Sequence, residues 1–403
     1  MKYIVMLGDG MADYPVEKLG GRTPLETAKK PNIDRLASKG ILGMVKTVPE
    51  GLKPGSDVAN LSAMGYNPVE CYTGRSPLEA VSIGIEMSDT DVAFRCNLVT
   101  LSEEADYDQK TMVDYSSDEI STAEAAQLIQ AVNDAFRSDE IEFYPGISYR
   151  HCMIWHEGPV GLDLTPPHDI SDRKITEYVP KNDVIYDLMK RSHEVLKNHP
   201  VNQAREARGL HPANSIWLWG EGTKPGVSSF EKTYGVKGAV ISAVDLIKGI
   251  GICAGMKVIE VEGATGNIDT NFTGKGKAAL ETLLEGQDLV YIHVEAPDEC
   301  GHRGEIENKV KAIELIDELI VGPLLEGLEQ AGEEYSILVM PDHPTPLAIK
   351  THISDPVPFL IYRSTDPVDS GINTYTEEAC RSTGRYVEHG HELMKALLEK
   401  NEI

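Results

Sequence analysis

The sequence contains no apolar run long enough to cross a membrane. A bilayer-spanning helix needs about 20 consecutive apolar residues, and none of the 403 residues lies in such a run. The first residues, MKYIVMLGDG, reach Asp9 after a short apolar run, so they predict a buried strand and not a signal peptide. We therefore expect a cytoplasmic protein that does not bind membranes.

The chain is also poor in basic residues. It has 38 Lys and Arg against 64 Asp and Glu, which gives a net charge of −26. This charge repels the phosphates of nucleic acid and the headgroups of anionic membranes, so we expect neither as a partner. A small anionic molecule could bind only where metal ions or a local cluster of cationic side chains reverse the field.

Two motifs with known chemistry are missing. The six cysteines are scattered without a C-x-x-C pair, which is typical of free thiols in a reducing compartment. The sequence has no G-x-x-x-x-G-K-[ST] segment, which excludes an ordinary P-loop site for ATP.

Short apolar runs and helical patterns are present, and they alternate along the chain. The runs are of strand length and continuous, as in strands buried on both faces, and they lie at Tyr3–Leu7, Ser215–Trp219, Leu289–Val294, Ser336–Met340 and Val357–Tyr362. Helical patterns lie at Pro31–Lys39, Ala239–Gly249, Lys275–Leu284 and Ile306–Ala331. This alternation predicts an α/β fold with a mainly parallel sheet.

The length of the chain suggests a second domain, because 403 residues exceed what one simple core organises. Residues 85–212 have a different character from the rest, with an amphipathic helix at Ser121–Phe136 and expected strands at Phe94–Leu101 and Cys152–His156. We predict a smaller α+β domain at 85–212, inserted into an α/β domain made of residues 1–84 and 213–403.

Acids and histidines follow three of the expected strands. They are Asp9, then Asp298 and His302, then Asp342 and His343, with His352 nine residues later. Taken singly, each group has a structural interpretation as a turn former, a helix-face pair or a polar loop. Because the carboxyl ends of parallel strands share one edge of a sheet, we expect the groups to converge.

Carboxylates and imidazoles without cysteine suit zinc or manganese. Asp9, Asp342 and His343 with a hydroxyl oxygen could hold one ion, and Asp298, His302 and His352 a second. Two ions about 4 Å apart are a common arrangement for phosphoryl transfer.

A serine in the segment GSDVANLSAMGY is the candidate nucleophile. Alone, Ser56 is most simply a helix N-cap. Beside a metal cluster, its hydroxyl could instead attack a phosphate at a helix N-terminus, which favours anions. We expect this second role.

Eight segments together resemble the archaeal-type cofactor-independent phosphoglycerate mutases of the alkaline phosphatase superfamily. They occur in family order over nearly the whole chain: GDGMAD, GSDVANLSAMGY, YTGRSPLEA, YRHCMIWH, TPPHDI, NSIWLWGEG, EAPDECGHRGE and MPDHPTPLAIKTHISDPVPF. The resemblance implies an alkaline-phosphatase-like sheet sandwiched by helices. It also implies an isomerase of glycolysis and gluconeogenesis that interconverts 3-phosphoglycerate and 2-phosphoglycerate through a phosphoserine at Ser56, with two divalent ions (Mn, Zn or Mg) and without 2,3-bisphosphoglycerate.

The resemblance further implies roles for individual residues. One ion would be held by Asp9, Ser56, Asp342 and His343, and the other by Asp298, His302 and His352. The inserted domain would clamp the small phosphorylated anionic substrate, and the implied substrate residues are Arg75, Arg150, His151, His168, Asp169 and Lys275. Arg75 has the alternative role of supporting the hinge, and Asp169 that of capping a helix.

Two other functions stay open at the level of the sequence. A homoserine kinase-like phosphotransferase would need the same serine and metals, and specificity would rest on the inserted domain. A non-enzymatic scaffold is disfavoured, because clustered buried acids destabilise a protein that binds no ions. The sequence makes no prediction of the oligomeric state.

Overall fold

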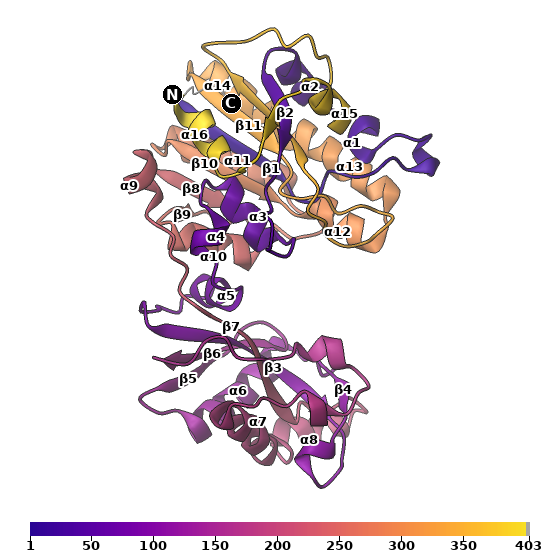
Figure 1. The fold of residues 1–403 in the computed structure, drawn as a ribbon, viewed down its shortest axis with the longest axis vertical. Coiled ribbons are helices and arrows are strands. Elements are labelled where there is room, and N and C mark those ends of the chain that lie inside the picture. Colours follow the sequence, from indigo (N-terminus) through magenta and orange to yellow (C-terminus); the bar gives the residue numbers. More distant parts are fainter. Residues whose placement is uncertain (400–403) are drawn as a thin grey trace. The chain divides into compact units, whose positions relative to one another are not determined.

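The structure, a computed structural model, describes residues 1–399. The chain forms two compact units (Figure 1). The first consists of Met1–Tyr72 and Gly226–Ile403, and the second of Thr73–Pro225. The range 85–212, predicted as an inserted domain, lies within the second unit.

The first unit is built on an eight-stranded sheet with the order β13-β2-β12-β11-β1-β10-β8-β9. Strands β11, β1, β10 and β8 are parallel neighbours, whereas β12 is antiparallel to β11 and β2. The central strands β10 and β11 are buried along their whole length, which explains their continuous apolar runs. The strands are β1 Lys2–Gly8, β2 Ile41–Val45, β8 Gly238–Ile241, β9 Lys257–Val258, β10 Leu289–Val294, β11 Tyr335–Met340, β12 Val357–Arg363 and β13 Tyr386–Val387.

Helices cover both faces of this sheet, so the predicted α/β architecture with a mainly parallel sheet is confirmed (Figure 1). Ile4 and Met6 of β1 pack in one core cluster with residues of α2, α11, α13 and α14. On the other face, the Tyr3 hydroxyl donates to the Leu398 carbonyl of α16. The helices are α1 Pro24–Thr27, α2 Pro31–Ser38, α3 Ser56–Ala63, α4 Pro68–Cys71, α9 Phe230–Tyr234, α10 Asp245–Cys253, α11 Phe272–Leu284, α12 Ala296–Arg303, α13 Ile306–Ile316, α14 Gly322–Gln330, α15 Glu377–Ser382 and α16 Glu392–Glu399, with a 3-10 turn at Glu17–Leu19.

Two sequence expectations for this unit are wrong in part. The pattern Ala239–Gly249 begins with strand β8, and helix α10 starts only at Asp245, because a run as short as GAVI does not distinguish a buried strand from a helix. The single helix expected at Ile306–Ala331 is interrupted by a π turn at Asp317–Val321.

The π turn directs the Asp317 carboxylate to the start of α2. This carboxylate accepts the backbone N–H groups of Asn32 and Ile33 at 3.2 and 2.7 Å, and the Asn32 amide at 2.9 Å. Lys30, the N-cap residue of α2, has only donors on its side chain and cannot serve these groups. Asp317 therefore caps a helix that is distant in sequence.

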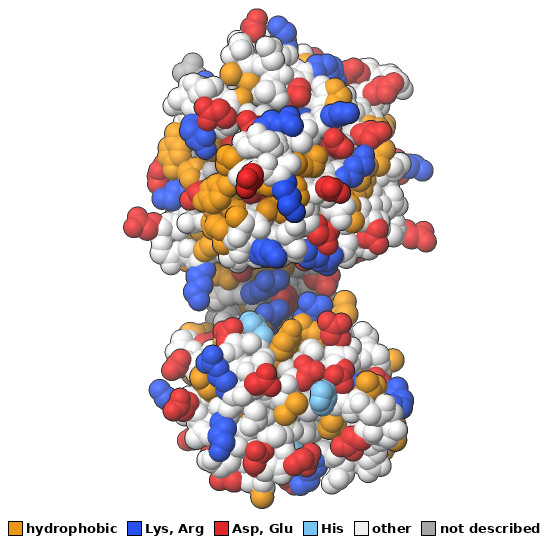
Figure 2. All heavy atoms as spheres, turned by 90° about the vertical axis from the view of Figure 1, so that its right-hand side faces the viewer, with side chains coloured by type: hydrophobic (Ala, Val, Ile, Leu, Met, Phe, Trp, Pro, Cys, Tyr) orange, Lys and Arg blue, Asp and Glu red, His pale blue; other side chains and the backbone are white. Residues whose placement is uncertain are grey.

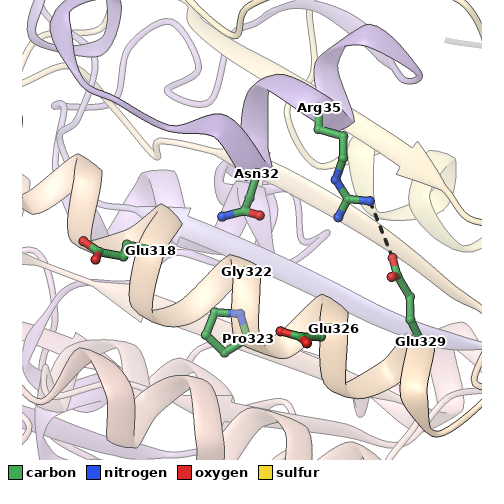
Figure 3. A pocket seen from close by; sticks show the side chains of 7 residues that line it. All are labelled: Asn32, Arg35, Glu318, Gly322, Pro323, Glu326 and Glu329. Carbon is green, nitrogen blue, oxygen red and sulfur yellow. Dashed lines mark ion pairs between the residues drawn. The ribbon is translucent and has the colours of Figure 1, made fainter.

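A surface hollow of about 450 Å³ lies beside this turn (Figure 3). Arg35 reaches from α2 toward Glu329 of α14, and their nearest atoms are 3.7 Å apart. Glu329 also accepts from the hydroxyl of Tyr335, the first residue of β11. Glu318 and Glu326 add negative charge, which makes the hollow unsuitable for an anionic ligand.

The second unit contains an antiparallel sheet in which β4, β3, β6 and β5 are successive neighbours and β7 also pairs with β3. The expectation that Ser215–Trp219 belongs to the large sheet is wrong, since the run forms β7 here; an apolar run does not specify its partner strand. The strands are β3 Asp91–Leu101, β4 Met112–Asp114, β5 Ile141–Tyr144, β6 Arg150–His156 and β7 Ser215–Thr223. The helices are α5 Ser76–Ser82, α6 Thr122–Phe136, α7 Asp183–Leu196 and α8 Pro200–Glu206, with 3-10 turns at Tyr107–Gln109, Pro167–Ile170 and Ile175–Glu177.

The surface view shows acidic and basic side chains interspersed over the visible face of each unit (Figure 2). Within residues 1–399, no helix is long and apolar enough to span a membrane. The six cysteines are free thiols, as the scattered spacing predicts.

The capping role of Asp317 predicts a local loss of stability. Asp317→Ala leaves the N–H groups of Asn32 and Ile33 unpaired, so we expect it to destabilise the protein by about 2 kcal/mol. Glu318→Ala, on the same turn but exposed, is the matched control and should change stability by less than about 0.5 kcal/mol. Thermal unfolding followed by circular dichroism measures both, and equal Tm values for the two variants would contradict the capping role.

Candidate active site

The sheet order brings the predicted acids and histidines to one edge. Strands β11, β1 and β10 are adjacent and parallel, so their carboxyl ends lie side by side. Asp9 follows β1, Asp342 and His343 follow β11, and α12, which carries Asp298 and His302, begins just after β10. His352 comes from the loop before β12, and its ring centroid lies 4.1 Å from that of His343.

One group of ligating atoms comes from Asp9, Asp342 and His343. An oxygen or nitrogen from each lies within 4.8 Å of the others, and all three residues are buried. The His343 Nε2 atom is 3.6 Å from Asp9 Oδ1 and 3.4 Å from Asp342 Oδ2. The Ser56 hydroxyl lies 3.2 Å from the same nitrogen and 3.4 Å from Asp9 Oδ2.

A second group comes from Asp298, His343 and His352, again within 4.8 Å of one another. The His302 Nε2 atom lies 3.1 Å from Asp298 Oδ2 and 2.9 Å from His352 Nε2. His343 thus lies within reach of both groups, whereas the sequence motifs assign it to the Asp9 group alone. All seven residues expected to hold metal are brought together.

Ser56 is the first residue of α3, and Gly55 occupies the N-cap position. The simple N-cap role is therefore not what the structure shows, because the Ser56 hydroxyl contacts Asp9 and His343 instead of a backbone N–H. The neighbouring Asp57 is bound by the Tyr72 hydroxyl at 2.6 Å. The serine is thus presented at the N-terminus of a helix, facing the cluster.

The carboxylates of the cluster are buried against one another. Burial raises the pKa of Asp9 well above its ordinary value, and the nearby carboxylates of Asp342 and Asp298 raise it further. Burial alone would also raise the pKa of Asp298, but hydrogen bonds with His302 and His352 hold that pKa well below its usual range. The same contact with Asp298 raises the pKa of His302 to about 9. This crowding of negative charge favours bound protons or cations.

Two details fit divalent cations. The Asp9 Oδ1 atom is buried and has no hydrogen-bond partner among residues 1–399, so it is an acceptor available for a cation. The Nδ1 atom of His302 lies 3.0 Å from the Lys350 carbonyl, which can only accept, so Nδ1 carries a proton and Nε2 is the ring nitrogen that a cation could bind in place of a proton. That nitrogen faces His352 Nε2 at 2.9 Å, an arrangement stabilised by a cation that both nitrogens bind.

Sequence reasoning missed several residues that contact the cluster, among them His293, Asn60 and Thr345, whose hydroxyl donates to Asp298 Oδ1. His293 lies within β10, and its Nε2 atom is 2.9 Å from Asp9 Oδ2. The Asn60 amide donates to Asp342 Oδ2 at 2.8 Å. Two signals could have found the first two: His293 is a polar residue inside the apolar run LVYIHV, and Asn60 lies four residues after Ser56, on the same helix face.

Five of the expected substrate residues lie in the second unit. Arg75 precedes α5 and pairs with Glu79 at 2.9 Å. Arg150 is exposed at the start of β6. His168 and Asp169 lie in the 3-10 turn Pro167–Ile170, where the His168 ring packs on Trp219 with a centroid distance of 5.4 Å.

His151 lies on the opposite face of the sheet from Arg150. It pairs with Cys96, whose side chain is in the core, and paired residues of antiparallel strands share a face. Its Nδ1 atom accepts the Gly146 N–H at 3.0 Å, and its buried Nε2 atom has no partner within the described chain. Burial lowers the pKa of His151 to about 3, so the ring is neutral and Nε2 is a donor.

Lys275, the remaining expected substrate residue, lies in α11 of the first unit. Its side chain is fully buried, and Nζ donates to the His293 carbonyl at 2.9 Å. Burial lowers the pKa of Lys275 to about 8. The lysine thus lies directly beside the strand that carries His293.

Comparisons with known proteins identify the family of the chain. The family model for 2,3-bisphosphoglycerate-independent phosphoglycerate mutase matches residues 37–202. The chain is 53% identical to the "Probable 2,3-bisphosphoglycerate-independent phosphoglycerate mutase" of Geobacter sulfurreducens, over 99% of this chain and 100% of that one. It is 49% identical to the 2,3-bisphosphoglycerate-independent phosphoglycerate mutase of Methanothrix thermoacetophila, with the same coverage.

Solved structures give the same result. A protein from Pyrococcus horikoshii shares 31% identity and a TM-score of 0.82, over 100% of this chain and 98% of that one. The cofactor-independent phosphoglycerate mutase from Thermoplasma acidophilum shares 25% identity and a TM-score of 0.71, over 99% of this chain and 100% of that one. On the strength of identities of 49% and more over nearly full lengths, the chain belongs to the family of 2,3-bisphosphoglycerate-independent phosphoglycerate mutases.

Proposed function

We propose that the chain is a metal-dependent isomerase that interconverts 3-phosphoglycerate and 2-phosphoglycerate through a phosphoserine at Ser56. One observation carries the proposal: the Ser56 hydroxyl lies within 3.4 Å of both Asp9 Oδ2 and His343 Nε2, inside a buried cluster of carboxylates and imidazoles. The close relatives named as mutases support the same substrates. No 2,3-bisphosphoglycerate would be needed, because the serine itself would carry the phosphoryl group between the two hydroxyls.

Two divalent ions would be held by residues of the cluster. Their ligands would be Asp9, Ser56, Asp342 and His343 for one ion, and Asp298, His302 and His352 for the other, with His343 in reach of both groups. Bound there, the ions would neutralise the phosphate and lower the pKa of the Ser56 hydroxyl.

The chain's own groups would direct the transfer. Ser56 Oγ would attack the phosphorus, so a bond from Oγ to phosphorus forms and the bond from phosphorus to the substrate's O3 breaks. The proton that Oγ loses balances the proton that O3 gains, and the reverse exchange with O2 returns the proton to Ser56. The glycerate would then reorient, and its O2 would take the phosphoryl group back from Ser56. The N-terminus of α3, where Ser56 lies, favours the negative charge of the phosphate throughout.

The substrate's carboxylate needs a partner of its own, because the protein carries a net charge of −26. We propose that the second unit supplies it and excludes water while the glycerate turns. Arg150 is the foremost candidate, since it is exposed and lies on the same sheet face as Trp219, against which His168 packs. Arg75, Asp169 and the unpartnered Nε2 of His151 are further candidates, and Lys275 would support the phosphate side.

Substitutions of two serines in helix α3 test whether Ser56 is the nucleophile. Ser56→Ala removes the attacking oxygen, so we expect mutase activity below about one thousandth of the wild-type rate. Ser62→Ala, in the same helix α3 and buried, is the matched control and should keep activity within about threefold. The measurement is the conversion of 3-phosphoglycerate to 2-phosphoglycerate, with homoserine plus ATP assayed alongside. Comparable activity of Ser56→Ala and Ser62→Ala would refute the role of Ser56.

The number of metal ions bound per chain tests the proposed metal ligands. Asp342→Asn replaces a charged ligand with an amide, so the purified variant should lose at least one ion per chain and most of its activity. Asp114→Asn is the control, because Asp114 lies in another acidic cluster, with Asp118 and His211, that is already hydrogen-bonded internally. Elemental analysis measures both variants. An unchanged ion content in Asp342→Asn would show that the ligand assignment is wrong.

Substitutions in the second unit test whether this unit binds the substrate's carboxylate. Arg150→Ala should raise the KM at least about tenfold and increase the inorganic phosphate released per isomerisation, because the carboxylate loses its partner and water enters. Arg137→Ala, an exposed arginine of the same unit that pairs with Glu142, should leave both values unchanged. If Arg150→Ala behaves like Arg137→Ala, the carboxylate binds elsewhere.

A further inference from the structure

His293 is placed to hold one metal ligand in a fixed orientation. We propose that its Nε2–H group binds Asp9 Oδ2 and thereby keeps Asp9 Oδ1 free for the cation, which makes His293 a positioning residue. The inference rests on the proposed metal-dependent function, because it concerns how the chain prepares one of the two groups of ligands. No sequence motif described above includes this histidine.

The contact is buried and short. His293 lies in β10, next to β1 in the sheet, and its side chain is fully buried. Its Nε2 atom is 2.9 Å from Asp9 Oδ2, and its Nδ1 atom is 3.1 Å from the Ser242 hydroxyl. Asp9 is 1% exposed, so water does not compete for these groups.

When Asp9 is ionised, as it would be when bound to a cation, the donors and acceptors along this chain have one consistent assignment. An ionised Asp9 can only accept, so His293 Nε2 carries the ring proton and Nδ1 presents its lone pair. Ser242 then donates its hydroxyl proton to Nδ1, and its oxygen accepts the Val244 N–H at 3.0 Å. A backbone N–H can only donate, so the sequence of bonds ends there. The Ser242 oxygen can accept this N–H and still donate its own proton to Nδ1, so it supports the tautomer of His293 that an ionised Asp9 requires.

The two oxygens of Asp9 are therefore unequal. Oδ2 is taken by His293, whereas Oδ1 is buried and without a partner in the part of the chain that the structure describes. His343 Nε2 lies 3.6 Å from this free oxygen. If His293 were removed, Oδ2 would keep only the longer contact of 3.4 Å with the Ser56 hydroxyl, and the carboxylate could rotate away from the other ligands.

Two residues earlier in β10, Tyr291 supports a second carboxylate of the cluster. The Tyr291 hydroxyl donates to Asn60 Oδ1 at 2.6 Å, and the Asn60 amide donates to Asp342 Oδ2 at 2.8 Å. Tyr291 and His293 share a face of the strand, opposite Val290 and Ile292 in the core cluster. His293 thus hydrogen-bonds Asp9 directly, and Tyr291 is connected to Asp342 through Asn60. Hydrogen bonds of this kind to the ligating carboxylates orient the ligands of a metal site.

The test measures metal binding directly, without turnover. Metal-stripped wild type and variants are titrated with Mn²⁺ by calorimetry. His293→Leu removes the donor and should weaken one of the two sites about 10- to 100-fold while the other is unchanged. His293→Gln keeps an N–H at a similar reach and should recover most of the loss. His193→Gln is the control, because that histidine lies in the second unit, where its Nδ1 atom contacts the Asn214 carbonyl.

A less disruptive substitution provides the test if His293→Leu does not fold. Ser242→Ala keeps the histidine and removes only the hydroxyl that hydrogen-bonds its Nδ1 atom, so the same site should weaken about three- to tenfold. Wild-type affinity at both sites in the folded His293→Leu variant, or in Ser242→Ala where the leucine variant is unfolded, would overturn the inference alone. A wild-type protein that binds no divalent ion would overturn the proposed metal-dependent function together with it.

Discussion

Three carboxylates buried at one edge of a parallel sheet are the constraint on which the rest of the structure depends. Burial raises the pKa of Asp9 well above its ordinary value, and the nearby charges of Asp342 and Asp298 raise it further. Such a cluster destabilises a fold unless protons or cations compensate it. Bound cations would supply this compensation and would at the same time attract a phosphate. In the function that we propose, the feature that costs stability would therefore also serve phosphoryl transfer.

The sheet topology explains how the cluster forms. Adjacent parallel strands β11, β1 and β10 end side by side, so ligands more than 300 residues apart in sequence, such as Asp9 and Asp342, meet at one place. Behind them, His293 and Asn60 each hold one carboxylate oxygen. In front, α3 presents Ser56 at its N-terminus. Ser56, Asp298 and His302 lie in helices, and Asp9 and Asp342 come just after strands, so regular elements position most of the cluster, whereas His352 comes from a loop.

The features that depend on local sequence pattern could be predicted from the sequence, whereas the features that depend on the pairing of strands could not. The central strands and the ligands that follow them were predicted, because burial on both faces gives continuous apolar runs and the ligands come directly after these. The sheet to which β7 belongs and the face to which His151 points were not, since both depend on strand partners. His293 was missed because it lies inside a strand, and the position of His343 between two groups appears only in three dimensions.

The central claim is that Ser56 carries the phosphoryl group during the reaction. The most direct measurement mixes wild-type enzyme and Mn²⁺ with 3-phosphoglycerate, quenches the mixture with acid within milliseconds and maps the peptides by mass spectrometry. The account predicts phosphate on Ser56, in the peptide that contains GSDVANLSAMGY. Active enzyme that shows phosphate on a different residue, or on none at any quench time, would contradict it.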